Sequence, residues 1–220
     1  MKLLYRIIGV LIGTMIMGLG VAMFDLSSLG FDALSALVIS IQNLIHVTYS
    51  IAYILLNLIF LVFMIIFLRN QIGIGTIINY LLTGVFCDIF IFLFKSINLN
   101  HSPYLLVNIV YGLIGVILLA LGIAVYANAN LGITPYDSMP IIITKYVKLF
   151  NKPVKFHVAR KIIDGICLTL ALIIGVIILK YKNIIGINTI VMLILVGYLI
   201  SFFSKIVNKY IYKTNKDMFK

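Results

Sequence analysis

The sequence has very little charge: only 10% of its 220 residues are charged, and none of its six acidic residues is a glutamate. A soluble domain usually has about 25% charged residues. With 63% hydrophobic residues and a mean hydropathy of +1.20, the chain lacks the polar surface needed to cover a globule in water. We therefore expect lipid to be its solvent. This composition excludes a soluble domain that could present a surface to nucleic acid.

Tryptophan is absent, and cysteine is scarce, with two residues. Without tryptophan, tyrosines at span ends such as Tyr49 and Tyr126 are expected to anchor the chain at the membrane interfaces. Cys87 and Cys167 fall inside apolar runs, so we expect no structural disulfide. Motifs of zinc hydrolases, serine hydrolases and P-loop proteins are missing as well. We expect no enzyme, no cofactor and no metal site.

Long apolar runs are abundant. About 20 helical residues cross a hydrocarbon core of ~30 Å, and six stretches approach or exceed this length. The sequence predicts an all-α polytopic bundle that forms a single membrane domain over residues 1–220, with the lipid bilayer as its partner. The predicted spans are Ile7–Phe24, Tyr49–Leu68, Ile74–Phe94, Tyr104–Ala127, Ile162–Leu179 and Ile184–Val207.

The net charge of +11 is distributed unevenly around these spans. If the N-terminus is cytoplasmic, only Lys95, Lys180 and Lys182 lie outside, and the other fourteen of the 17 basic residues lie inside. Cytoplasmic segments of membrane proteins carry such an excess of Lys and Arg. We predict that both termini are cytoplasmic and that the basic tail, residues 209–220, lies against anionic headgroups.

The chain contains an internal repeat. Leu29-Gly30 matches Leu131-Gly132 at an offset of 102, and Asp32 matches Asp137 if three residues are inserted. Downstream, Ile72–Thr76 matches Ile185–Thr189. Repeat 1 covers about 5–95 and repeat 2 about 104–208. Each holds three spans, an odd number, which predicts inverted-topology repeats with a site at their interface.

Small residues also recur between the first and fourth spans. Small side chains in membrane helices let two backbones approach closely. We therefore expect a group of glycines to mediate helix packing. The group consists of Gly13, Gly18 and Gly20 in repeat 1 and Gly115 and Gly122 in repeat 2.

An amphipathic segment separates the first and second spans of each repeat. These segments, Phe31–Ile45 and Met139–Phe150, cannot be full spans, because almost no linker separates Ile45 from the span that starts at Tyr49. They predict interfacial or re-entrant half-helices on opposite sides. The second begins at Thr134 and Pro135: a threonine hydroxyl can cap a helix, and proline fits its first position. Asp137 complements the free N–H groups of the first turn.

Candidates for a substrate or ion pathway are the charged residues at or inside the spans. Asp32 and Asp137 either cap helices or bind a ligand. Asp88 is either a proton or cation relay or a neutral acid bonded to a neighbouring helix. Arg160 and Asp164, four residues apart, form either a local ion pair or a fixed charge at the mouth of a pathway. With Thr134 and Pro135, these residues form our candidate site.

The motifs Gly18-Leu-Gly-Val-Ala22 and Leu131-Gly-Ile-Thr-Pro-Tyr-Asp137 resemble those of the YczE/YitT-type bacterial integral membrane proteins. Leu29-Gly-Phe-Asp32 and Ile72-Gly-Ile-Gly-Thr76 fit the same pattern. The YczE side fits better, because nothing here resembles the soluble C-terminal domain common on the YitT side. The resemblance implies a bacterial cytoplasmic membrane and about six spans, and it implies no defined substrate.

Two functions agree with these patterns. The first is a small-molecule permease or substrate-binding membrane subunit, driven by an ion gradient or a partner. The second is a non-transporting scaffold or accessory protein of another membrane complex, with a homo-oligomer or a partner membrane protein as its assembly. A polar cavity lined by Asp32, Asp88 and Asp137 would favour the first, with an unknown small molecule or ion as ligand. A dry, filled interior would favour the second.

Overall fold

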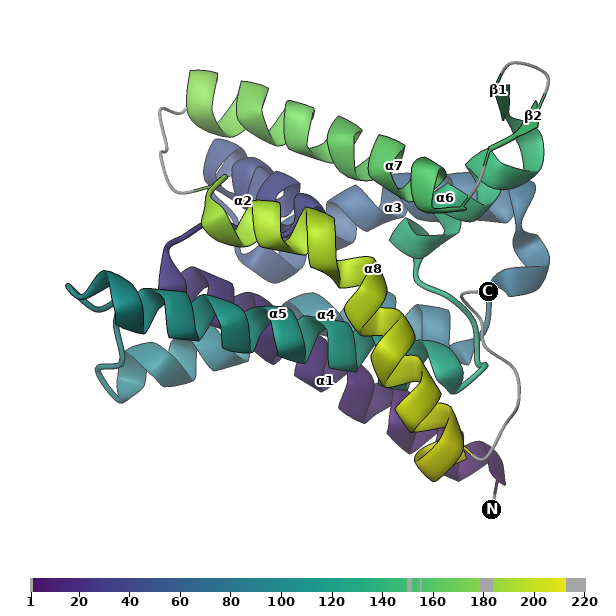
Figure 1. The fold of residues 1–220 in the computed structure, drawn as a ribbon, viewed down its shortest axis with the longest axis horizontal. Helices are drawn as coiled ribbons and strands as arrows, with labels where there is room; N and C mark the ends of the chain where they lie inside the picture. Colours follow the sequence, from purple (N-terminus) through teal and green to yellow (C-terminus); the bar gives the residue numbers. More distant parts are fainter. Residues whose placement is uncertain (1, 150–151, 155, 179–183, 213–220) are drawn as a thin grey trace.

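The computed structural model describes residues 2–149, 152–154, 156–178 and 184–212 of the chain. These residues form an elongated bundle of helices in which α1 begins and α8 ends at the same end (Figure 1). The elements are α1 (Lys2–Ser27), α2 (Ala33–Ile45), α3 (Tyr49–Phe67), the 3₁₀ turn η1 (Arg69–Gln71), α4 (Ile74–Ser96), α5 (Leu105–Asn128), α6 (Pro135–Tyr146), β1 (Lys148–Leu149), β2 (Lys152–Pro153), α7 (Phe156–Ala171), the π-helical η2 (Leu172–Ile178), α8 (Ile187–Val207) and the π-helical η3 (Asn208–Tyr212).

The predicted all-α membrane bundle is confirmed. Among the described residues, five helices are long and apolar enough to cross a membrane: α1, α3, α4, α5, and α8 together with η3. The remaining predicted span, Ile162–Leu179, corresponds to α7 and η2. Its helix begins earlier than predicted, at Phe156, and Leu179 lies outside the described residues.

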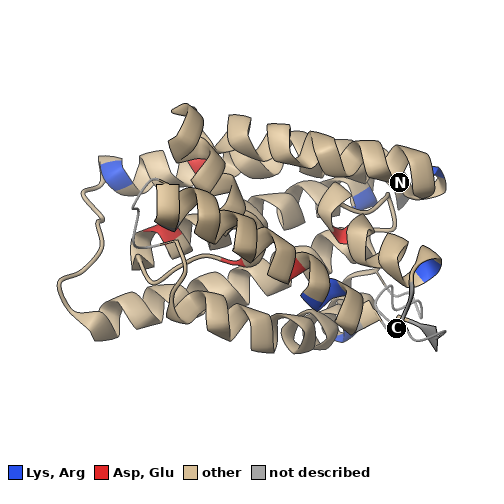
Figure 2. Cartoon of the chain, turned by 90° about the horizontal axis from the view of Figure 1, so that it is seen from above, with Lys and Arg blue, Asp and Glu red and all other residues tan. Residues whose placement is uncertain are grey.

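The outer surface of the bundle is apolar. Ile66 of α3, Phe92 of α4 and Leu106 of α5 expose between 66% and 77% of their surface. A soluble protein rarely exposes a continuous apolar patch larger than a few hundred Å². Figure 2 shows the acidic positions spread along the bundle, with most described basic positions near the end that carries the start of α1. Lipid is therefore the solvent of the outer face.

The predicted packing glycines lie at the closest helix contacts of α1. A Cβ atom on Gly13 would lie 2.9 Å from the carbonyl oxygen of Gly122, and one on Gly20 would lie 3.1 Å from that of Gly115. Gly18 faces α4, where a Cβ would lie 2.9 Å from the backbone nitrogen of Cys87. Real Cβ contacts are rarely this short, so side chains at these positions would separate the helices.

Two turns connect the halves of the chain by equivalent hydrogen bonds. Leu29 O accepts a hydrogen bond from Asn188 N at 3.0 Å, and Leu131 O accepts one from Gly75 N at 2.8 Å. These four residues are matched in pairs by the repeat, at offsets of 102 and 113. Each repeat therefore holds the turn of the other with the start of its own last helix.

The glycine after each of these carbonyl groups adopts a backbone conformation that L side chains avoid. Gly30 has φ +94° and Gly132 has φ +114°. A Cβ on Gly30 would also lie 2.9 Å from Cα of Gly186, and one on Gly132 would lie 3.0 Å from Cα of Gly73. We name these two equivalent contacts, Gly30 with Gly186 and Gly132 with Gly73, the crossed turns.

The start of each half-helix corrects the predicted repeat alignment. Asp32 is the N-cap of α2, whereas Thr134 is the N-cap of α6, and each lies two residues after its positive-φ glycine. Asp32 therefore corresponds to Thr134, and Ser35 corresponds to Asp137, at the unbroken offset of 102. The predicted three-residue insertion is wrong. A carboxylate and a hydroxyl can both cap a helix, so matching like residue types gave the wrong register.

The half-helices themselves are present. α2 ends at Ile45, as predicted, and α6 ends at Tyr146, while the predicted end at Phe150 lies outside the described residues. Pro140 lies inside α6, and the helix continues past it. The labels of α2 and α6 lie toward opposite ends of the bundle (Figure 1), and the two helices start from the interior.

Candidate functional site

A cavity of about 50 Å³ lies in the centre of the bundle, and all eight α-helices contribute to its wall. A buried water needs roughly 10–15 Å³ measured in this way, so the cavity has room for a few waters or a small solute. Both half-helices present their first residues to it. The polar residues of its wall are Asp32, Ser35, Tyr49, Tyr53, Thr83, Thr134, Tyr136, Asp137, Arg160 and Asp164.

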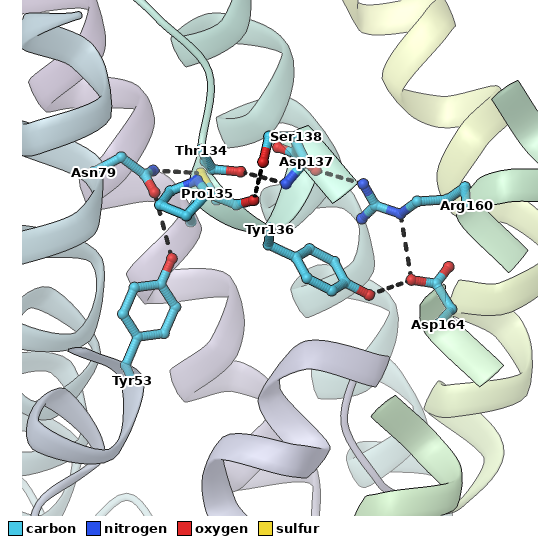
Figure 3. A network of polar contacts seen from close by, with 10 residues as sticks. Tyr53, Asn79, Thr134, Pro135, Tyr136, Asp137, Ser138, Arg160 and Asp164 are labelled. Carbon is cyan, nitrogen blue, oxygen red and sulfur yellow. Dashed lines mark hydrogen bonds and ion pairs between the residues drawn. The ribbon is translucent and has the colours of Figure 1, made fainter. Parts of the chain in front are cut away.

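Arg160 of α7 holds two carboxylates at one side of the cavity (Figure 3). Its Nη1 donates to Asp137 Oδ1 of α6, and its Nε lies 3.3 Å from Asp164 Oδ1 of α7. The Asp137 and Asp164 side chains expose only 10% and 9% of their surface. The predicted pair at i and i+4 is present, and Asp137 extends it to a second helix.

Tyr136 completes this cluster. Its hydroxyl donates to Asp164 Oδ1, and its ring lies 4.8 Å from the guanidinium carbon of Arg160. An arginine over an aromatic face gains electrostatic attraction in addition to its hydrogen bonds. We name Tyr136, Asp137, Arg160 and Asp164 the arginine cluster. Because it joins α6 to α7, it fixes the half-helix against α7.

Asp137 is not the cap of α6. The hydroxyl oxygen of Thr134 accepts from Asp137 N at 2.9 Å, and Pro135 follows as the first helical residue. The cap is thus complete without the Asp137 carboxylate, which instead binds Arg160. Its position in the first turn still places a negative charge beside the positive end of the helix dipole.

Asp32 caps α2, but only one of its oxygens takes part. Ser35 N donates to Asp32 Oδ2 at 3.4 Å, a long hydrogen bond. Asp32 Oδ1 exposes less than 1 Å² and accepts no hydrogen bond from any residue that the structure describes. Buried oxygens without a partner are rare and costly. This atom belongs to a residue that lines the cavity.

The opposite side of the cavity is formed by hydroxyl groups that already donate hydrogen bonds. Tyr49 Oη donates to Ser35 Oγ at 3.0 Å, and Tyr53 Oη donates to Asn79 Oδ1 at 3.3 Å (Figure 3 shows the Tyr53 bond). Thr83 Oγ1 donates to the backbone oxygen of Asn79 at 2.8 Å. These bonds connect α2, α3 and α4 around the cavity.

Sequence reasoning missed the tyrosines of this site. Tyr49 and Tyr126, expected as interface anchors, are 1% and 0% exposed, and Tyr53 and Tyr136 are buried as well. The expectation is wrong for these two tyrosines, because it used only their position in the span, whereas Tyr5, Tyr104 and Tyr210 at other span ends are exposed. The position of Tyr53 inside an apolar run could have indicated a polar site within the bundle, since a buried hydroxyl needs a hydrogen-bond partner.

Asp88 lies outside the cavity wall. Its Oδ2 accepts from Ser50 N at 2.9 Å, so the carboxylate satisfies a free N–H group in the first turn of α3. Of the two interpretations of this residue, the geometry agrees with an acid bonded to a neighbouring helix. The structure thus brings Asp32, Thr134, Asp137, Arg160 and Asp164 of the predicted site together at the cavity, and it separates Asp88 from them. Pro135 follows Thr134 as the first residue of α6 but does not line the cavity.

Comparison with known proteins agrees with the predicted resemblance. The chain is 29% identical over 216 residues to the uncharacterized protein YyaS of Bacillus subtilis (strain 168), with 98% of each chain covered. It is 39% identical over 80 residues to the uncharacterized membrane protein YczE of the same organism, which covers 36% of this chain and 35% of YczE. No solved structure matches. The family of unknown function DUF6198 matches residues 4–205, and the chain belongs to this family.

Proposed function

We propose that this multi-pass membrane protein is a permease, or the substrate-binding subunit of one, which takes a small polar solute into the central cavity. One observation carries the proposal: a cavity where the two half-helices begin is lined by three carboxylates and an arginine. A scaffold needs only a well-packed interior, and buried charges would destabilise it without purpose. In membrane proteins, ionisable groups at such depth mark substrate and ion pathways.

The symmetry of the contacts supports a mechanism of alternating access. Gly13 and Gly20 of α1 meet Gly122 and Gly115 of α5, so residue numbers rise along one helix as they fall along the other. Gly13 corresponds to Gly115, and Gly20 corresponds to Gly122, at the repeat offset. Each contact therefore has its two-fold copy, and the helices are antiparallel. Inverted repeats of transporters are related by such an axis in the membrane plane.

The crossed turns fit this mechanism. Each half-helix begins directly after a turn that the other repeat holds, so a movement of one repeat is transmitted to the half-helix of the other. Rocking of two repeats around a fixed central site would open the cavity first to one side and then to the other. The energy would come from an ion gradient or a partner protein.

Accessibility of a cysteine in the cavity tests this proposal. Ala33→Cys lines the cavity, and Ala52→Cys, equally small and fully buried away from it, is the matched control. Both are placed in a chain with Cys87→Ala and Cys167→Ala, and both are treated with a membrane-impermeant thiol reagent in right-side-out and inside-out vesicles. We expect Ala33→Cys to react from both sides and Ala52→Cys from neither. If Ala33→Cys is as unreactive as the control, the cavity does not open and the scaffold function holds.

A further inference from the structure

We infer that the central cavity binds a small monovalent cation, with the Asp32 carboxylate as its principal ligand. The inference rests on the proposed function in that it takes the cavity to be a binding site. It adds the chemical class of the ligand. The observations that carry it are the unpartnered oxygen of Asp32, the donors and acceptors of the wall, the balance of charge and the size of the cavity.

The hydrogen-bonding inventory of the wall favours a ligand that donates or coordinates. The hydroxyl groups of Tyr49, Tyr53 and Tyr136 already donate to protein acceptors. Asp32 Oδ1, in contrast, is a buried acceptor with no donor among the described residues. A carboxylate can only accept. Arg160 Nε also has no hydrogen-bond partner among the described residues, but it lies 3.3 Å from Asp164 Oδ1 in an ion pair. A ligand that fits Asp32 Oδ1 must therefore donate a hydrogen bond or be a metal cation.

The charged residues of the cavity wall also favour a cation as the ligand. The cavity wall contains three carboxylates, Asp32, Asp137 and Asp164, but a single described cation, Arg160. Arg160 is shared by Asp137 and Asp164, so no positive side chain in the described wall remains for Asp32. The positive ends of α2 and α6 are also occupied, because each has an aspartate of its own in or before its first turn. An anionic ligand would find no free positive partner here.

Size limits the cation. The cavity, at about 50 Å³, is about a third of the ~150 Å³ cavity that accommodates benzene in an engineered protein. It can hold an alkali ion with a few waters, or ammonium or a small primary amine. The rings of Tyr49 and Tyr53, whose centroids lie 6.1 Å apart, belong to the same wall. Aromatic faces attract such cations.

Thermal unfolding of the purified full chain in lipid nanodiscs tests the inference. Sodium, potassium and ammonium chloride are each compared with N-methylglucamine chloride, whose cation is too large for the cavity, at equal ionic strength. A ligand that binds only the folded state raises its stability. We expect at least one of the three small cations to raise the unfolding midpoint by about 3 °C or more at saturation. The three salts distinguish an alkali ion from an ammonium group.

Two aspartate variants make the test specific. Asp32→Asn should abolish the cation-dependent shift, because loss of a charge-assisted contact lowers affinity by about tenfold or more. Its midpoint in N-methylglucamine chloride should match the wild type, since asparagine caps a helix about as well as aspartate. Asp25→Asn is the control, since Asp25 does not line the cavity, and it should keep the full shift. A shift that persists in Asp32→Asn, or no shift with any salt, would overturn the inference.

Protection of a neighbouring cysteine gives a second measurement if Asp32→Asn does not fold. In Ala33→Cys, the bound cation should slow thiol labelling, and N-methylglucamine should not. Equal labelling rates in all four salts would contradict the inference. This result can be distinguished from failure of the proposed function. Labelling from both sides without any cation effect would contradict only the cation site. A cation effect with labelling from one side only would contradict only the transport function.

Discussion

At the scale of single residues, Arg160 is the basic residue that pairs with two buried carboxylates. It pairs with one carboxylate of its own helix and one of the half-helix α6, and its side chain is only 20% exposed. Removing one member of a buried ionic cluster leaves the others without compensation, which costs more than the cluster contributes when it is intact. Arg160 therefore positions Asp137 and Asp164 and offsets part of the negative charge of the cavity wall.

Arg160→Gln should lower the free energy of unfolding by about 3–5 kcal/mol, because Asp137 and Asp164 would remain buried and unpaired. The adjacent Lys161 is exposed, so Lys161→Gln provides the matched control and should change stability by less than about 0.5 kcal/mol. Unfolding in mixed micelles, followed by circular dichroism, measures both. Equal stability of the two variants would show that the arginine cluster contributes nothing to the fold.

Thr134 and Asp137 have different roles at the start of α6, and substitutions can distinguish them. Thr134→Ala removes the cap of α6 and should cost about 1 kcal/mol. Asp137→Asn leaves that cap in place but removes the charge that binds Arg160, and it should cost about 1.5–3 kcal/mol. The order of the two losses, measured by the same unfolding assay, checks the assignment. A larger loss for Thr134→Ala would show that the helix cap contributes more to stability than the pair of Asp137 with Arg160.

Part of the site could be predicted from residue spacing. Arg160 and Asp164 are four apart on one helix, and Thr134-Pro135 marks a helix start, so both features follow from local geometry. The partnership of Asp137 with Arg160 could not be predicted, because it depends on how α6 packs against α7. Asp32 was matched with Asp137 on chemical type, whereas the caps show that its counterpart is Thr134.

At the scale of elements, the crossed turns need glycine at two equivalent positions. Gly30 and Gly132 have positive φ, and each lies against the backbone of the other repeat. Only glycine combines that conformation with so close an approach. The half-helices that follow, α2 and α6, depend on these turns for their position beside the cavity.

Gly132→Ala should destabilise the protein by at least about 1–2 kcal/mol, because alanine is strained in the left-handed region and its Cβ would displace Gly73. Gly197 in α8 has no neighbour within 4 Å of its Cβ position. Gly197→Ala should therefore be neutral or stabilise the helix by up to about 1 kcal/mol. The midpoint of thermal unfolding compares the two. A harmless Gly132→Ala would mean that the crossed turn is not tightly held.

The membrane helices could be predicted because hydrophobic length is a local property of the sequence. The predicted starts of α3 and α4, at Tyr49 and Ile74, agree with the structure. α7 begins earlier than predicted, because its first turns carry Arg160 and Lys161, which an apolar criterion rejects. The charge of Arg160 is compensated by Asp137 from a different element, and no local pattern reveals such compensation.

At the scale of the whole molecule, orientation in the membrane remains a proposal that the charge distribution supports. η1 and the turn between α4 and α5 lie at opposite ends of the helix α4 that separates them. Asn70 and Asn100 are exposed residues in these two segments, so they form a matched pair. Asn100→Cys should react with an impermeant reagent applied to intact cells, and Asn70→Cys should react only in inside-out vesicles. The reverse pattern would place both termini outside.

Cation flux in proteoliposomes tests the central claim most directly. Liposomes containing the wild-type chain, Asp32→Asn or Asp25→Asn, and protein-free liposomes, are placed in gradients of sodium, potassium or ammonium, and their cation content is measured over time. We expect one of these cations to equilibrate faster with the wild type and with Asp25→Asn than without protein. Asp32→Asn should lose this effect by about tenfold or more. Wild-type liposomes that match protein-free liposomes for all three cations would contradict a cation pathway through the cavity.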